Sequence, residues 1–208
     1  MIAIIDYGMG NIHSVQKALE FLGAETFLTN KPKDLMRSDK AVLPGVGAFD
    51  DAVAELRRRG LISALTEYIK QGKIFLGICL GMQLLFETSQ EGKLRGLNIL
   101  KGRVRRFNKK SAVKIPHIGW NQLNLENKGC PLLKGLADKS YVYFCHSYYP
   151  GPARKEAVAA TTDYGIKFTS IVWQDNVFGV QFHPEKSQEA GLKILNNFVN
   201  APTTYGTK

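Results

Sequence analysis

The chain has 208 residues, a length that suits one sizeable hydrophobic core. Hydrophobic residues make up 44% and charged residues 22%, as in ordinary globular proteins, and no run of about 18 apolar residues offers a membrane span, which argues against a transmembrane-helix protein. The formal net charge of +10 invites a nucleic-acid-binding hypothesis, but net charge alone reports on partners only loosely.

Short apolar runs alternate with amphipathic helical patterns in the first half of the chain, which is typical of an α/β fold. Asn11 is expected to cap a helix that ends at Gly23. The continuous apolar run from Ile74 to Ile78 predicts a central parallel strand covered on both faces. The other elements expected in this half are strands at 2–6, 25–28 and 41–43 and helices at 49–58, 61–70 and 81–87.

The second half reads as strands separated by turns, followed by a closing helix. Strands are expected at 97–107, 141–145, 157–161, 168–173 and 177–182, and the helix at 188–200. No internal repeat, low-complexity linker or domain boundary is visible. The sequence therefore predicts one α/β domain over residues 1–208, with a mostly parallel central sheet flanked by helices and antiparallel strands added in the second half.

Two basic clusters contribute to the positive charge. Residues 57–59 are three arginines at the end of a helical pattern, where cations favour the helix dipole. Residues 101–106, continued by Lys109 and Lys110, alternate as in a strand, so that their charges can point to solvent. We interpret both as solvated faces or contacts with an acidic partner, because the chain lacks the aromatic-basic motifs of nucleic-acid-binding modules.

Three cysteines, at 79, 130 and 145, are widely spaced, which favours neither a disulfide framework nor a zinc site. The N-terminus is a short apolar run ending in Asp6, without the basic start and long apolar stretch of a signal peptide. We therefore expect a reducing, cytoplasmic compartment and one reactive thiol. His13, His117 and His146 lack metal-ligand spacing and are interpreted as capping or packing residues.

The most informative stretch is 73–83, where a buried strand runs directly into a helix with Cys79 at the joint. Gly77 and Gly81 flank the cysteine as in a Gly-x-nucleophile-x-Gly elbow, since the sharp turn brings backbone too close for a Cβ atom. The helix N-terminus favours thiolate, and the backbone N–H of Leu80 is expected to face a forming oxyanion. A nucleophilic cysteine is predicted; the alternative is an inert buried one.

A strand predicted over 177–182 leads into His183 and Glu185. Positions i and i+2 of an extended chain face the same side, and Pro184 biases His183 towards an extended conformation. Glu185 can then hold the imidazole in the correct tautomer while the imidazole takes the proton of Cys79. The alternative is a surface His-Pro-Glu turn.

The turn Pro44–Gly47 closes the third expected strand. Its glycines let backbone N–H groups approach a substrate or turn towards an oxyanion, which makes the N–H of Val46 a second candidate donor. Gly8 and Gly10 at a helix start could belong to a dinucleotide loop, but His13 stands at the third glycine position of that fingerprint.

Together the segments 44–47, 77–83 and 183–185 resemble the class I, or triad, glutamine amidotransferases, and they follow one another along the whole chain. The resemblance implies that Cys79 attacks the side-chain amide of glutamine and forms a glutamyl thioester. It also implies that His183 protonates the departing ammonia and then activates water. No cofactor or metal is implied, and the residues implied in glutamine binding are Gly47, Gln83, Ser147 and Tyr148.

The stretches 6–11, 116–121 and 143–148 are similar to the glutaminase subunits of imidazole glycerol phosphate synthase, in histidine biosynthesis. That resemblance implies a heterodimer with a (β/α)8 cyclase, which receives ammonia through its barrel and forms imidazole glycerol phosphate and AICAR. It further implies a glutaminase that works appreciably only when docked and is stimulated by the cyclase ligand. The interface residues it suggests are Asn11, Trp120, Tyr143 and Lys186.

Other functions remain open at this point. A free-standing cysteine hydrolase or peptidase would have a similar elbow, but it would not need Gln83 or the turn at 44–47. Among glutaminases, the nearest alternatives are subunits that serve pyridoxal phosphate or anthranilate synthesis, and the stretch 119–121 argues against both.

Overall fold

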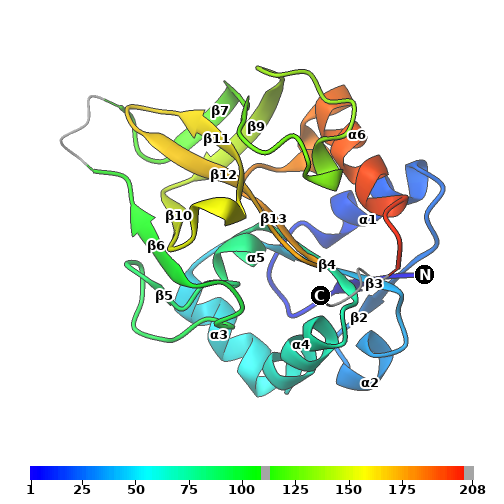
Figure 1. The fold of residues 1–208 in the computed structure, drawn as a ribbon. Coiled ribbons are helices and arrows are strands. Elements are labelled where there is room, and N and C mark those ends of the chain that lie inside the picture. Colours follow the sequence, from blue (N-terminus) through cyan, green and yellow to red (C-terminus); the bar gives the residue numbers. More distant parts are fainter. Residues whose placement is uncertain (109–112, 204–208) are drawn as a thin grey trace.

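The computed structural model describes residues 1–108 and 113–203. Its centre is an eight-stranded sheet in the order β2-β1-β3-β4-β13-β12-β11-β8 (Figure 1). The first five strands of this order are parallel and the last three are antiparallel to their neighbours, as the sequence predicts. The strands are β1 (Ile2–Ile5), β2 (Thr26–Thr29), β3 (Lys40–Gly45), β4 (Ile74–Cys79), β8 (Asn124–Leu125), β11 (Val158–Asp163), β12 (Lys167–Gln174) and β13 (Val177–Val180).

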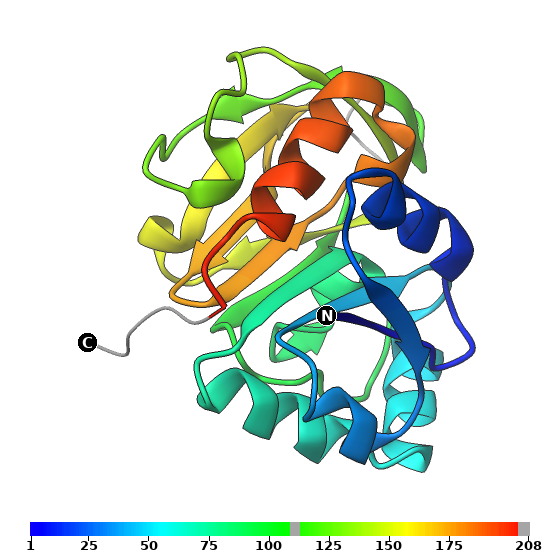
Figure 2. The same cartoon turned by 90° about the vertical axis from the view of Figure 1, so that its right-hand side faces the viewer.

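Helices cover both faces of this sheet (Figures 1 and 2). One face carries α1 (Ile12–Phe21) and α6 (Gln188–Val199), and the other carries α2 (Pro32–Leu35), α3 (Phe49–Arg58) and α4 (Leu61–Lys70). The side chains of β4 alternate between the two cores, with Leu76 in the first and Phe75 in the second. Because both faces are covered, the whole strand is apolar and buried.

Two smaller sheets lie beside the central one and are joined by the chain between β9 and β10. One contains β10 (Tyr148–Pro152), β6 (Gly102–Arg106) and β5 (Thr88–Ser89), and the other contains β7 (His117–Gln122) and β9 (Tyr141–His146). The chain passes from β9 to β10 through Ser147. The short 3₁₀ helices are η1 (Pro131–Leu133), η2 (Lys155–Ala157) and η3 (Pro184–Lys186).

The bounds of α3 and α4 agree with the predicted ranges, but three local expectations were wrong. The helix after Cys79, α5 (Leu80–Gln83), ends four residues early, because the apolar residues that follow turn into the core instead of continuing one amphipathic face. The strand expected at 97–107 begins only at Gly102, whose φ of 125° breaks an extended run. Asn11 precedes α1 but makes no capping hydrogen bond with its side chain, whose oxygen accepts from Ser14 Oγ at 2.9 Å.

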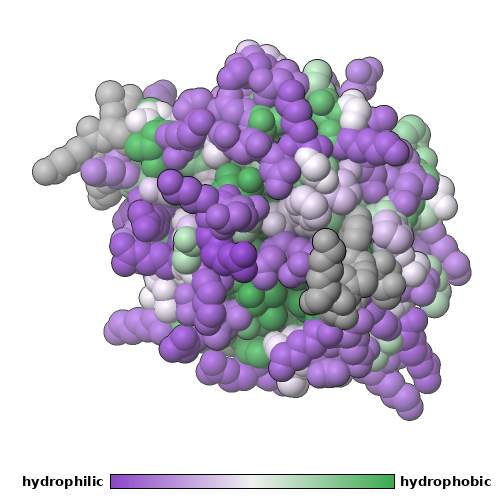
Figure 3. Space-filling view, in the orientation of Figure 1, coloured by the Kyte–Doolittle hydropathy of each residue, from purple (hydrophilic) through white to green (hydrophobic). Residues whose placement is uncertain are grey.

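The basic clusters lie on the surface, as expected. Arg58 and Arg59 at the end of α3 both pair with Glu55, and the arginines of β6 at 103, 105 and 106 are exposed. Lys109 and Lys110 lie outside the described residues. The face in Figure 3 is mainly hydrophilic, with a hydrophobic area near its centre. Within residues 1–108 and 113–203, none of the helices combines the length and apolar character required to cross a membrane.

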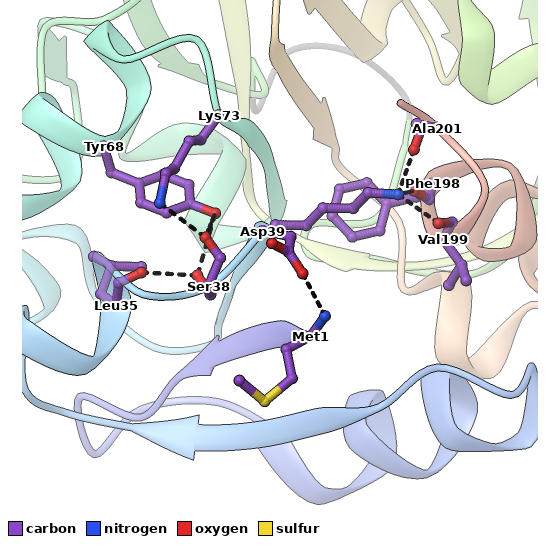
Figure 4. Close-up of polar contacts among 10 residues, drawn as sticks. Met1, Leu35, Ser38, Asp39, Tyr68, Lys73, Phe198, Val199 and Ala201 are labelled. Carbon is purple, nitrogen blue, oxygen red and sulfur yellow. Dashed lines mark hydrogen bonds and ion pairs between the residues drawn. The ribbon is translucent and has the colours of Figure 1, made fainter. Parts of the chain in front are cut away.

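The end of α6 is tied to the central sheet by a buried lysine. The three residues that accept from it, Phe198, Val199 and Ala201, are labelled in Figure 4. Lys40, at the start of β3, donates through its ammonium to the carbonyls of Phe198, Val199 and Ala201. The carbonyls at a helix C-terminus have no partner within the helix, and a cation favours the dipole there. This contact connects the last helix to the first half of the chain.

Candidate active site

The predicted elbow is present at the end of β4. Cys79 has a φ of 54° and a ψ of −109°, an uncommon conformation for a residue other than glycine. A Cβ atom on Gly77 would lie 2.6 Å from the carbonyl oxygen of Gly81, and one on Gly81 would lie 1.8 Å from the carbonyl oxygen of Leu43. Both flanking positions therefore need glycine, as the elbow pattern requires.

The Cys79 side chain is only 5% exposed, yet it lines a cavity of about 300 Å³ together with His183. A buried, inert cysteine does not fit this position at a cavity wall. The following helix, α5, has only four residues, so the helix dipole expected to favour thiolate is short. The group beside the sulfur is the imidazole of His183, which makes a hydrogen bond with Cys79.

His183 lies between the thiol and a buried acid. Its Nδ1 is 2.9 Å from Oε1 of Glu185, and both side chains are almost fully buried. Burial alone would lower the pKa of His183, but the hydrogen bonds and negative charges of Cys79 and Glu185 outweigh burial and raise it to about 10. The arrangement therefore favours an imidazolium beside the sulfur, ready to donate a proton.

The backbone groups expected to stabilise an oxyanion border the same cavity. Val46 and Leu80 both line it, and Gly45 is the register partner of Cys79 across β3 and β4. Gly47, also in the lining, has a φ of 104°, which a residue with a side chain rarely adopts. The turn after β3 thus lies beside the nucleophile.

The other residues implied in glutamine binding also line this cavity. Gln83, Ser147 and Tyr148 all face the cavity. Gln83 Nε2 donates to the carbonyl of Tyr148 at 3.0 Å and to Oε1 of Gln181 at 3.1 Å, and Gln181 Nε2 lies 3.6 Å from the Cys79 sulfur. The site therefore holds a hydrogen-bonded chain of amides that leads to the nucleophile.

Sequence reasoning missed Gln181 and two further residues at the site. Glu91 lines the cavity, and burial raises the pKa of its carboxyl, which accepts from the backbone N–H of Phe49 at 3.0 Å. Ser187 accepts from the N–H of Tyr143 and donates to the carbonyl of His183. Gln181 lies two residues before His183 in the strand predicted over 177–182, so it could have been found from strand alternation. Glu91 and Ser187 belong to no recognisable pattern.

The four residues suggested for a partner interface lie in two groups. Tyr143 and Lys186 line the cavity, with the lysine ammonium 6.0 Å from the tyrosine ring centroid. Trp120 is 46% exposed, pairs with Tyr143 across β7 and β9, and packs edge-on against its ring at 6.1 Å between centroids. Asn11 is exposed at the start of α1.

Comparisons with known proteins agree with this geometry. Residues 3–201 match the family model "Glutamine amidotransferase class-I". The chain is 52% identical to "Imidazole glycerol phosphate synthase subunit HisH" of Gloeobacter violaceus, over 95% of this chain and 88% of that protein. It is also 52% identical to the HisH subunit of Desulfitobacterium hafniense, over 95% of this chain and 93% of that protein.

A solved structure shows the same fold at low sequence identity. PurLQS from Thermotoga maritima superposes with a TM-score of 0.75 and 21% identity, over 96% of this chain and 97% of that chain. The sequence matches agree with the geometry of the site, which has the elbow glycines and the Cys79–His183–Glu185 arrangement. The chain therefore belongs to the class I glutamine amidotransferases and, within them, to the HisH family of imidazole glycerol phosphate synthase subunits.

Proposed function

We propose that this chain is the glutaminase subunit of imidazole glycerol phosphate synthase. It hydrolyses L-glutamine through Cys79, His183 and Glu185 and passes the ammonia to a (β/α)8 cyclase in a heterodimer. The proposal treats residues 1–208 as one glutaminase domain. All three cysteines are free thiols, which suits a reducing compartment, and we assign the reaction to the cytoplasm.

The observation that carries the proposal is the imidazole of His183 held between the Cys79 sulfur and the Glu185 carboxylate at a cavity wall. The thiolate attacks the side-chain carbonyl carbon of glutamine, and the negative oxygen that forms accepts from the N–H groups of Leu80 and Val46. His183 protonates the nitrogen as the C–N bond breaks, which releases ammonia and leaves a glutamyl thioester on Cys79. His183 then deprotonates a water molecule, which attacks the thioester and forms glutamate and the free thiol.

The cavity offers complementary groups for the charged end of glutamine. The Glu91 carboxylate is suited to the α-ammonium group, while the N–H groups around Ser147 and Tyr148 are suited to the α-carboxylate. Gln83 and Gly47 complete the lining around the side chain of the substrate. A general cysteine hydrolase would not need this set of groups.

An exposed apolar surface on β7 and β9 supports a docking role. Ile118, Trp120 and Tyr141 are 59%, 46% and 56% exposed on its outer side. Tyr143 of β9 connects this surface to the cavity, because it pairs with Trp120 and lies in the cavity lining. Such aromatic residues are common at protein interfaces. We propose that the cyclase docks here and also contacts Asn11 and Lys186.

The test of the chemistry uses the complex with the cyclase. Cys79→Ala is expected to abolish glutamine-dependent synthesis of imidazole glycerol phosphate and to leave ammonia-dependent synthesis intact, because only the nucleophile is removed. Ammonia-dependent turnover in the same sample is the control for assembly. Glutamine-dependent synthesis by the variant would contradict the mechanism.

The test of the interface compares two exposed aromatic residues. Trp120→Ala is expected to weaken cyclase binding by about tenfold or more, since interface aromatic residues often dominate binding energy. Phe21→Ala is the matched control, because Phe21 is 77% exposed at the end of α1 that lies away from Asn11. Titration calorimetry measures both, and equal affinities would place the cyclase elsewhere on the surface.

A further inference from the structure

Two buried histidines outside the triad face each other across β7 and β9. His117 and His146 are register partners, and Nδ1 of His117 lies 3.1 Å from Nε2 of His146. His146 lines the glutamine cavity, whereas His117 is stacked between the rings of Phe144 and Tyr164 at 4.8 Å and 3.8 Å. The proposed chemistry uses neither imidazole.

The hydrogen-bond partners of these rings determine which nitrogen carries each proton. His146 Nδ1 lies 2.8 Å from the carbonyl of Tyr148, and because a carbonyl only accepts, this nitrogen must donate. The opposite nitrogen of a neutral His146 therefore accepts, and His117 Nδ1 donates to it. His117 Nε2 is then an acceptor, and the amide nitrogen of Asn121 lies 3.4 Å from it.

The orientation of the Asn121 amide agrees with this direction. Its nitrogen also donates to the carbonyl of Asp163 at 3.0 Å, and its oxygen accepts from the N–H of Gln122 at 2.8 Å. Four groups thus form a chain in which every hydrogen bond points the same way, from Asn121 through His117 and His146 to the carbonyl of Tyr148.

The surroundings keep both rings neutral. Burial lowers the pKa of His117 to about 4. Burial also lowers the pKa of His146, to about 3; its hydrogen bond to the carbonyl of Tyr148 opposes this shift, whereas positive charge on His117 or His183 would add to it. A second proton on either ring would break one hydrogen bond of the chain, because it would place two donors opposite each other.

The carbonyl at the end of the chain is the one that orients Gln83, whose Nε2 donates to it at 3.0 Å. We propose that His146 and His117 are positioning residues for the glutaminase reaction: their one-way hydrogen-bond chain, which begins at Asn121 beside Trp120, holds the Tyr148 carbonyl and thereby the Gln83 amide in the glutamine cavity. This inference rests on the proposed function of that cavity.

The first test is independent of activity. The chain contains only four histidines, so their imidazole nitrogens can be assigned by long-range ¹H–¹⁵N NMR. Free imidazole side chains in water prefer the Nε2–H form, whereas this hydrogen-bond chain requires Nδ1–H for both His117 and His146 near neutral pH. An Nε2–H or protonated ring at either position would overturn the inference, whether or not the protein hydrolyses glutamine.

The second test separates positioning from packing in the cyclase complex. In His146→Asn the amide nitrogen can still donate to Tyr148, whereas in His146→Phe the aromatic volume remains but the donor is lost. We expect the phenylalanine variant to raise KM for glutamine about tenfold and to change kcat less than about threefold, because the triad is untouched. The asparagine variant is expected to stay within about threefold of wild type in KM.

His117→Phe is the third variant, and it is expected to raise KM less than His146→Phe, because His117 acts on the carbonyl only through His146. Ammonia-dependent synthesis reports on folding and docking in every sample. The positioning role would be overturned if wild type and His146→Phe had equal KM values for glutamine. It would also be overturned if the asparagine and phenylalanine variants of His146 raised KM equally. Loss of glutaminase activity in wild type itself would instead contradict the proposed function.

Discussion

At the scale of single residues, the site depends on Cys79 and the imidazole beside it. Cys79 has a backbone conformation with positive φ, and His183 lies between Cys79 and Glu185, to which its ring nitrogens donate hydrogen bonds. Glu185 is almost fully buried behind the ring, where it orients the imidazole without touching the substrate cavity. The acid and the nucleophile therefore have different roles in the reaction, and their removal has different consequences.

Glu185→Gln is expected to lower glutamine turnover by roughly a hundredfold to ten-thousandfold, less than Cys79→Ala, because the nucleophile and the oxyanion donors remain. The same change is expected to lower the pKa of His183 below its value of about 10. The negative charge of Glu185, which raises this pKa, is lost, while burial still favours the neutral ring. Steady-state kinetics and an NMR titration of His183 measure the two effects. An unchanged titration midpoint would contradict the electrostatic role of Glu185.

At the scale of elements, the joint between β4 and α5 determines where the nucleophile lies. The strand is buried on both faces and pairs with β3 and β13, so its end cannot move freely. The first turn of α5 packs so closely on β3 that a Cβ on Gly81 would overlap the Leu43 carbonyl oxygen. The elbow is thus held by backbone contacts instead of by flexible side chains.

Gly81→Ala is therefore expected to reduce the free energy of unfolding by about 3 kcal/mol, because a methyl group must displace backbone in a packed core. Glutamine turnover is expected to fall as well, since the displaced backbone carries Cys79 and Leu80. Gly129→Ala is the control, because Gly129 is exposed and its nearest contact is a side-chain oxygen at 3.2 Å. Urea denaturation of the three proteins gives the comparison, and similar midpoints for both variants would refute the close packing.

At the scale of the whole molecule, distant segments are joined by a few buried polar groups. Lys40 ties the end of α6 to β3, and burial lowers the pKa of its ammonium while Asp39 opposes that shift. The histidine chain similarly links β7 and β9 to the start of β10. Both contacts join parts of the chain that no local pattern connects.

Lys40→Met is expected to reduce the free energy of unfolding by about 2–3 kcal/mol, because hydrogen bonds to a charged group are lost and the carbonyls at the end of α6 are left without their cation. Lys33→Met, at an exposed position on α2, is the control and is expected to have little effect. Chemical denaturation measures both variants. A Lys40→Met protein as stable as the control would show that the contact contributes little.

Acid is expected to destabilise the fold through His117 and His146. Their pKa values are lowered to about 4 and about 3, so the folded state keeps them neutral while the unfolded chain binds protons below about pH 6.5. Stability from each ring is therefore complete above that pH and is lost as pH falls towards 4, by up to about 1.4 kcal/mol per pH unit. Denaturation of wild type and His146→Phe between about pH 6.5 and 4.5 tests this, and equal slopes would contradict it.

Much of the architecture was predictable because local signals were strong. The amphipathic patterns at 49–58 and 61–70 predicted two helices within their observed bounds, and the apolar run at 74–78 predicted the central strand. The helix after Cys79 was predicted too long. Residues 84–86 are apolar, which is compatible with a longer helix as well as with a buried turn, and only tertiary packing decides that they turn into the core. Segments such as 117–122 and 148–152 carry mixed patterns, and their pairing with distant strands makes them extended.

For the site, the sequence by itself determined the elbow glycines, Cys79 and the pair His183 and Glu185, since each depends on neighbours within a few residues. Only the tertiary structure decided that Glu91 and Ser187 join them, and that His117 meets His146. The reason is physical: the direction of a hydrogen bond and the burial that keeps a ring neutral arise from groups far apart in the chain.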